Sequence, residues 1–262
     1  MLRQELELIY KKYNKKEYIH PDPLEYIYHF KTKEDREIGG LLAACFAYGR
    51  VNQILKTLSN IFEIMRAEPC NYILKKDKNL IKKDFKNFKY RFANGSNAYN
   101  LIVNIKNVYK KFGSIEGCFR KGYSKKDKTI IPALNFLSKE LSNETGHLIA
   151  NPNKGSACKR SNLYLRWMIR NDDVDPGCWK SISTDKLIVP LDTHMHKIGK
   201  ILGFTSRKQA NMKTALEITN GFKKILPEDP IKYDFSLTRF GIRDELAIDS
   251  LKQRLLFSAK KK

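Results

Sequence analysis

The sequence contains few cysteines, and their spacing excludes the sites that cysteines usually build. Five are present among 262 residues, at Cys45, Cys70, Cys118, Cys158 and Cys178. An odd number at wide, irregular intervals does not form a disulfide framework, and no Cys-x-x-Cys pair is present that could begin a zinc site. This usage fits a reducing compartment, so we expect a cytoplasmic protein.

The sequence also lacks a long apolar run. A membrane-spanning helix needs about 20 consecutive apolar residues, and no segment approaches that length without charged residues. Residues 1–13 alternate charged and apolar side chains, unlike the continuous apolar stretch of a signal peptide. We therefore expect a soluble intracellular protein that has no membrane partner.

Acidic residues are scarce relative to basic ones. Fifty Lys and Arg stand against 28 Asp and Glu, which gives a net charge of +22, while the hydrophobic content of 42% is ordinary for a globular core. The charge therefore belongs to a folded body, and its field attracts polyanions, of which nucleic acid is the commonest. A lysine-rich proteome would give the same composition without such a partner.

Apolar residues recur at helical spacing through most of the chain, and no alternating strand pattern is convincing. The expected helices cover residues 34–48, 51–66, 97–112, 131–141, 156–170, 193–202 and 209–225. We interpret residues 75–90 as a solvated loop or exposed helix face, residues 94–96 as a turn, and residues 120–128 as a basic surface loop. The sequence predicts an all-α unit over residues 1–262, with two helical lobes, approximately 34–150 and 151–258, joined through one core.

Lys159 is placed unusually for a lysine. Ser156 is a favoured N-cap type, so Lys159 falls in the first turn of its helix, where the N–H groups already supply positive potential. Lys154 and Arg160 lie close by and add to that potential. A free lysine titrates near ~10.4, and like charges with partial burial favour the neutral amine. The position therefore suits Schiff-base chemistry, although a lysine that is solvated or that contacts a phosphate would look the same.

The same helix carries a basic edge. Arg166 and Arg170 each point within about 20° of Lys159, while the remaining faces are largely apolar. A buried helix with such an edge needs an anionic partner, which can be a protein carboxylate or DNA. Arg160, Arg166 and Arg170 are thus candidates for phosphate contacts.

Asp192 ends an apolar run just before the expected helix 193–202, which makes it an N-cap candidate. The N–H groups that a capping carboxylate accepts hold it rigidly and keep it ionised, which suits a group that stabilises positive charge or takes a proton. Asp192, His194 and His196 could instead form a metal site. Positions i and i+2 of a helix point about 200° apart, so this alternative would require a strand.

Several segments resemble a known enzyme superfamily. Residues 189–194, Val-Pro-Leu-Asp-Thr-His, are similar to the Val-Asp-Thr-His segment of the helix-hairpin-helix DNA glycosylases of the endonuclease III superfamily. A distant bacterial branch of that superfamily, of uncharacterised function and also related to the archaeal 8-oxoguanine glycosylases, resembles nearly the whole chain. Its resemblance is carried by residues 37–40, 47–50, 154–160, 165–170, 190–192 and 229–235.

The resemblance implies a two-lobed, all-α glycosylase-like fold with damaged double-stranded DNA bound across a cleft between the lobes. It also implies that Asp192 is the essential aspartate and that Lys159 is the nucleophile of bifunctional members, with Arg160 as the alternative if the alignment slips by one position.

The chain departs from the superfamily in two places. Residues 151–155 have one glycine where a Gly-x-Gly hairpin is usual, and residues 171–188 form a probable insertion between lysine and aspartate.

The resulting hypothesis is a base-excision glycosylase, with AP-lyase activity as a further step. Lys159 attacks C1′ of a flipped nucleotide, Asp192 stabilises the developing positive charge or deprotonates the amine, and the base leaves. Trp179 is the candidate for stacking on that base, whereas Trp167 reads as a core residue. Lys154 and His194 are further DNA-binding candidates. No cysteine arrangement matches the superfamily's iron–sulfur motif, so we expect no cofactor.

Two other functions fit the same residues. A non-catalytic DNA- or RNA-binding helical protein would use Lys159 as a phosphate contact, because a binding lysine and a nucleophilic lysine look alike in sequence. A metal-dependent hydrolase would use His194 and His196.

Overall fold

The computed structural model describes residues 1–243 and 245–260, and the side chains of its last helix are described as far as Leu255. The helices are α1 (Leu2–Tyr13), η1 (Lys16–Tyr18), η2 (Pro23–His29), α2 (Lys33–Cys45), α3 (Val51–Ile64), α4 (Pro69–Lys75), α5 (Lys78–Asp84), α6 (Gly95–Phe112), α7 (Ile115–Lys121), α8 (Ile131–Leu141), η3 (Pro152–Lys154), α9 (Lys159–Ile169), η4 (Thr184–Lys186), α10 (Thr193–Ile201), α11 (Met212–Lys223), α12 (Asp234–Ile242) and α13 (Ile248–Lys260). The strands described, β1 (Lys89–Tyr90) and β2 (Ala93–Asn94), pair antiparallel as a short hairpin. The prediction of a mostly helical protein is confirmed.

Several expected boundaries need correction. Residues 94–96 are not a separate turn, because Asn94 caps α6 and forms a capping box with Asn97. Residues 75–90 include the helix α5, whose residues except Ile81 are exposed, so the exposed-helix alternative holds there, and the strand β1, which was not predicted. The helix expected at residues 131–141 has the predicted bounds. The helices α1, α4, α7, α12 and α13 were not predicted from the sequence.

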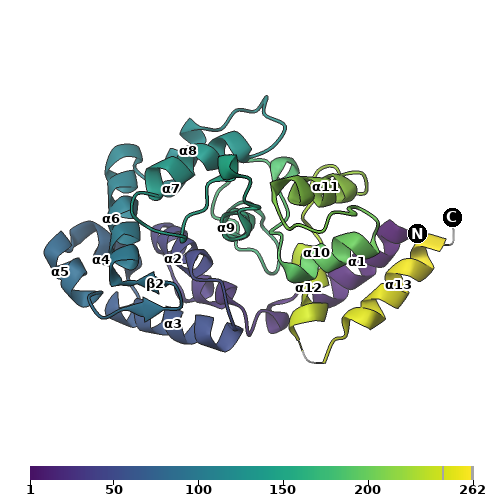
Figure 1. Cartoon of the computed structure of the whole chain (residues 1–262), viewed down its shortest axis with the longest axis horizontal. Coiled ribbons are helices and arrows are strands. Elements are labelled where there is room, and N and C mark those ends of the chain that lie inside the picture. The colour runs from purple at the N-terminus through teal and green to yellow at the C-terminus, as the bar shows by residue number, and fades with distance from the viewer. Residues whose placement is uncertain (244, 261–262) are drawn as a thin grey trace.

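Helix α9 lies between two groups of helices. The helices from α2 to α8 gather on one side of it, and α1 and α10 to α13 gather on the other, with α1 packed against α12 and α13 (Figure 1). The buried apolar side chains of both groups form one continuous cluster. The Lys159 end of α9 therefore lies where segments from both halves of the chain can approach it.

Close packing of α2 against α9 fixes this central position. A side chain at Gly40 of α2 would meet the Cε atom of Met168 at 3.1 Å, so the two helices approach as closely as a glycine permits. On the α9 side, Tyr164, Leu165 and Trp167 are almost completely buried. Among the described residues, no helix has the length and apolar character needed to cross a membrane.

The expected insertion at residues 171–188 is folded into the core. Asp175 and Trp179 within it are fully buried, and an antiparallel bridge joins Asn171 to Pro176. The Gly177 and Trp179 amides donate to the carbonyls of Trp167 and Met168. The segment therefore closes the C-terminal end of α9 and carries the chain on to Asp192.

Candidate active site

The start of α9 is shaped by an unusual backbone conformation. Cys158 precedes the helix with φ 47°, in the left-handed region that non-glycine residues rarely adopt. Its side chain is buried, and its amide donates to Oγ of Ser156 at 3.2 Å. Ser156 is therefore not the N-cap that we predicted, but Lys159 is still in the first turn, as the first residue of α9.

The amine of Lys159 is half-buried and meets the end of another helix. Its Nζ lies 3.5 Å from the carbonyl oxygen of Ala47, just after α2, in a long hydrogen bond. The neighbouring Arg160 donates from Nη1 to the carbonyl of Cys45 at 2.8 Å. The carbonyl end of α2 thus favours both cations, whereas the positive N-terminal end of α9 opposes them.

Asp192 caps α10, as its sequence position predicted. Its Oδ1 accepts from the amide of Met195 at 2.7 Å, and its carbonyl accepts the amide of His196 at 2.9 Å. The side chain is partly exposed. This cap holds the carboxylate at the beginning of the helix and satisfies part of its hydrogen-bonding capacity with a donor that favours the ionised form.

Lys159 and Asp192 line one pocket of about 550 Å³. Its wall also includes residues from the loop before η2, the loop after α2, and α12. The two candidate catalytic residues are 33 positions apart in the sequence, so the fold and not local structure brings them together. The volume falls within the range of about 300–1,000 Å³ typical of small-molecule sites.

His194 also reaches this pocket, while His196 does not line it. A side chain at Gly241 of α12 would come within 2.0 Å of Nδ1 of His194, so the glycine makes room for the imidazole. The Nε2 atom of His196 is paired with the carbonyl of Arg207 at 2.9 Å. Within residues 1–243 and 245–255, no three His, Cys, Asp or Glu side chains are grouped to hold a metal ion.

Arg166 and Arg170 are partnered by protein carboxylates, which corrects their assignment as phosphate contacts. Arg166 is 2% exposed and pairs with Asp175 at 3.1 Å and with Asp234. Arg170 is also buried, and its guanidinium pairs with Asp175 and with two further carboxylates, Asp172 at 2.9 Å and Asp229 at 3.0 Å. The sequence left open whether protein carboxylates or DNA would neutralise these arginines, and in the fold the carboxylates do so.

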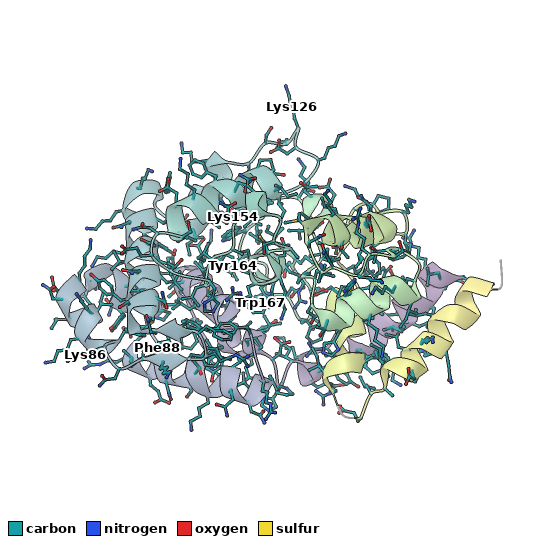
Figure 2. All side chains as sticks on the ribbon, viewed as in Figure 1. Lys86, Phe88, Lys126, Lys154, Tyr164 and Trp167 are labelled. Atoms are coloured by element: carbon teal, nitrogen blue, oxygen red, sulfur yellow. The ribbon has the colours of Figure 1, made fainter. Side chains whose placement is uncertain are left out.

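Trp179 is also in the core, so its assignment to base stacking is wrong. It is 1% exposed, and its Nε1 donates to Glu37 of α2 at 2.8 Å. Trp167 is fully buried, as expected for a core residue (Figure 2). Neither tryptophan lines the pocket of Lys159.

Lys154 is exposed at the end of η3, in the segment that replaces the expected hairpin (Figure 2). The amides of Asn153, Lys154 and Gly155 donate within the segment itself, to the side chain or carbonyl of Asn151 and to the carbonyl of Pro152. These amides are therefore already used in the loop, while the Lys154 amine stays on the surface.

Sequence reasoning missed Asp234 as a pocket residue. Asp234 is the first residue of α12 and is 3% exposed. Burial raises its pKa to about 6, the nearby Arg166 lowers it, and Asp192 raises it further. Its segment, residues 229–235, was part of the resemblance, but nothing local showed that it would face Asp192.

A second hollow of about 420 Å³ shares Ala47, Tyr48 and Lys159 with this pocket. Tyr48, Phe92 and His147 line it, together with Arg160, whose guanidinium lies 5.1 Å from the Tyr48 ring centroid. Phe92 lies in the turn between β1 and β2 and is 76% exposed, which is unusual for a phenylalanine. No sequence motif marked Phe92 or His147, because each is a single residue outside any recognisable pattern.

The family described as a protein of unknown function, DUF2400, matches residues 22–243. This chain belongs to the DUF2400 family. The match covers most of the chain and includes Lys159, Asp192 and Asp234. No curated protein and no solved structure matches the chain significantly.

In this DUF2400 protein the pocket places an amine, a capped carboxylate, a buried carboxyl and an imidazole around one volume. An amine can add to an electrophilic carbon, and a rigid carboxylate can stabilise the positive charge that develops there. The arrangement is therefore suited to covalent chemistry on a small electrophile that is inserted into the pocket.

Proposed function

We propose that this protein is a DNA glycosylase that excises a base from damaged duplex DNA, with Lys159 as nucleophile and Asp192 as its anionic partner. The observation that carries the proposal is the convergence of Lys159 and Asp192 on one pocket. The pocket belongs to a cleft between two helical lobes, and the DNA lies across that cleft with one nucleotide flipped into it. The net charge of +22 supports a polyanionic substrate.

In the proposed reaction, Nζ of neutral Lys159 forms a bond to C1′ of the flipped nucleotide. The bond between C1′ and the base breaks, and the base leaves with that electron pair. Asp192 stabilises the positive charge on the sugar during the exchange, because its cap holds it in place without further reorganisation. The nitrogen then loses its proton and its electron pair forms the C1′=N bond, while the C1′–O4′ bond breaks and O4′ takes that electron pair and a proton. Loss of a C2′ proton from this imine expels the 3′-phosphate and cleaves the strand.

Arg160, Lys154 and His194 remain in the proposed DNA-binding set. Lys154 is exposed, and His194 lines the pocket. Part of the hydrogen-bonding capacity of Arg160 is already used, because its guanidinium donates to the carbonyls of Cys45 and His147. We assign it mainly to holding the end of α2 against the start of α9.

Borohydride trapping tests the proposal. Incubation with a duplex that contains an abasic site or 8-oxoguanine, followed by reduction, is expected to link wild-type protein covalently to DNA. Lys159→Gln should lose the adduct by at least about 100-fold, because no other amine replaces the nucleophile. Lys139→Gln is the matched control, since Lys139 is an exposed lysine of α8 outside the pocket.

A nucleic-acid-binding protein without chemistry is the second candidate. The hydrogen bond from Lys159 to the carbonyl of Ala47 favours it, because that amine is already used as a donor. This candidate predicts no adduct from wild-type protein with either lesion, together with DNA or RNA binding that weakens as salt is added. An adduct that persists in Lys159→Gln would contradict our assignment of the nucleophile.

A further inference from the structure

Asp234 is a second carboxyl in the pocket, and the proposed reaction gives it no role. It lies in the pocket wall and is almost completely buried. One oxygen, Oδ2, accepts from Nη1 of Arg166. The other, Oδ1, is buried and has no hydrogen-bond partner among the described residues. A buried polar atom without a partner is costly, so this oxygen needs an explanation.

The charged surroundings of Asp234 come from several elements. Arg166 of α9 supplies opposite charge, and Asp192 at the start of α10 and Asp175 after α9 supply like charge. On the same helix as Asp234, Arg239 is paired with Asp22 at 2.8 Å. The titratable groups that face Asp234 or share its pocket are Arg166, Lys159, Tyr48, Asp175, Asp192, His194, Asp22 and Arg239. Asp175 is fully buried between Arg166 and Arg170 and is not part of the pocket wall.

Asp192 and Asp234 differ in what stabilises their ionised forms. Asp192 is partly exposed and accepts a backbone N–H, whereas Asp234 is buried and its oxygen Oδ1 accepts nothing. Burial raises the pKa of Asp234 to about 6, and the negative charge of Asp192 contributes to that rise. Two carboxyls that share one site do not ionise independently, and the one in the poorer environment holds the proton.

We propose that Asp234 is the proton acceptor of the pocket: it takes the proton that the Lys159 ammonium releases, while Asp192 stays ionised. In this transfer an N–H bond of the ammonium breaks, its electron pair remains on nitrogen, and an O–H bond forms at Oδ1 of Asp234 through pocket water. No oxidant or reductant takes part. The role of the resulting amine rests on the proposed function, whereas the coupling between the two carboxyls does not.

Carboxyl titration by ¹³C NMR tests the coupling without any substrate. The Asp234 carboxyl is expected to titrate near pH 6 in wild-type protein. In Asp192→Asn its midpoint should fall by about half a pH unit or more, because a neighbouring negative charge is removed. Asn is also a favoured N-cap residue, so α10 keeps its start. An unchanged midpoint, or a wild-type midpoint near the ordinary aspartate value of ~3.9, overturns the coupling.

The pH profile of borohydride trapping tests the proton transfer. Wild-type trapping of a duplex with an abasic site should rise with pH through an inflection near 6. Asp234→Asn should lose that inflection and trap about 100-fold more slowly at pH 7.5, the lower range for a lost general base. Asp175→Asn is the matched control, because it removes another buried partner of Arg166. It should keep an inflection, moved to lower pH because the charge of Asp175 also raises the pKa of Asp234.

The outcomes separate the two proposals. If Asp234→Asn and Asp175→Asn slow trapping equally and both keep an inflection, Asp234 has only a structural role. No trapping by wild-type protein contradicts the proposed function and the proton transfer together, while the NMR titration still decides the coupling. Circular dichroism of each variant establishes that it is folded, and the wild-type and Asp192→Asn titrations decide the coupling even if Asp234→Asn does not fold.

Discussion

Glu37 is a buried carboxylate that ties α2 to α6, to the start of α7 and to the segment after α9. Its Oε2 accepts from Tyr109 Oη at 2.6 Å and from the amide of Ile115 at 3.0 Å. Its Oε1 accepts from the amide of Glu116 at 2.7 Å and from Trp179 Nε1 at 2.8 Å. Burial raises the pKa of Glu37, and these donors act in the opposite direction. The carboxylate thereby holds the start of α7 and the segment after α9 against one helix.

Glu37→Gln should destabilise the protein substantially. A glutamine offers one acceptor oxygen, so its NH₂ group would face donors that then lack partners in the core. Each such unsatisfied group costs about 1–3 kcal/mol, and we expect a total loss of about 2–4 kcal/mol in urea unfolding. Glu140→Gln removes only an exposed ion pair with Lys111 and should change stability by less than about 1 kcal/mol. Similar losses in the two variants would contradict this account.

At the scale of elements, α1 is fastened to the segment that leads into α12. Nζ of Lys232 lies 2.8 and 2.9 Å from the two carboxylate oxygens of Glu7, and Tyr233 Oη donates to Glu7 at 2.7 Å. Burial raises the pKa of Glu7, but the bonds from Lys232 and Tyr233 outweigh it, so the pKa is lowered. A group whose pKa is lowered on folding stabilises the folded state only where it is ionised.

The contribution of Glu7 should therefore disappear in acid. It is fully present above the unfolded pKa of about 4.5 and is lost as pH falls through the lower folded value. Glu7→Gln should reduce the free energy of unfolding by about 1 kcal/mol at pH 7, and by progressively less below pH 4. Thermal unfolding at pH 7 and pH 3 measures the difference, with the exposed Glu17→Gln as control. A deficit of the same size at both pH values would rule out this linkage.

At the scale of the whole molecule, the excess positive charge is spread over many exposed side chains. Lys126, for example, projects from the loop between α7 and α8 (Figure 2). By contrast, Arg166, Arg170 and Arg239 are neutralised inside the protein by aspartates. The positive field of the protein thus belongs to surface lysines and arginines and not to the basic edge of α9.

Binding to duplex DNA should depend steeply on salt. If six or more phosphates are contacted, affinity falls by about 10³-fold or more between 50 and 200 mM salt, because condensed counterions are released on binding. Fluorescence anisotropy with a labelled duplex measures this slope. Lys159→Gln should keep almost the same slope, since one charge among 50 basic residues is removed. Salt-independent binding would show that the net charge does not serve DNA recognition.

Local sequence patterns were sufficient for several elements of the site. The cap of Asp192 on α10 and the first-turn position of Lys159 both depend on residues within one helical turn. Ser156 was misassigned because the left-handed conformation of Cys158 shifts the helix start by two residues. Helix α12 was missed because its residues from Asp234 to Phe240 are all buried, so its sequence lacks the apolar and polar faces that mark an amphipathic helix.

The sequence by itself determined a mostly helical protein, its strong positive charge, and a capping aspartate, because each follows from composition or from contacts between near neighbours. Only the tertiary structure decided which anion meets which cation. Arg166 pairs with Asp234 across 68 positions, Trp179 meets Glu37 across 142, and Lys159 reaches the end of α2 across 112. Such pairs depend on how distant helices cross. The residue type in the sequence is the same whether its partner is a buried carboxylate, a backbone carbonyl or a phosphate.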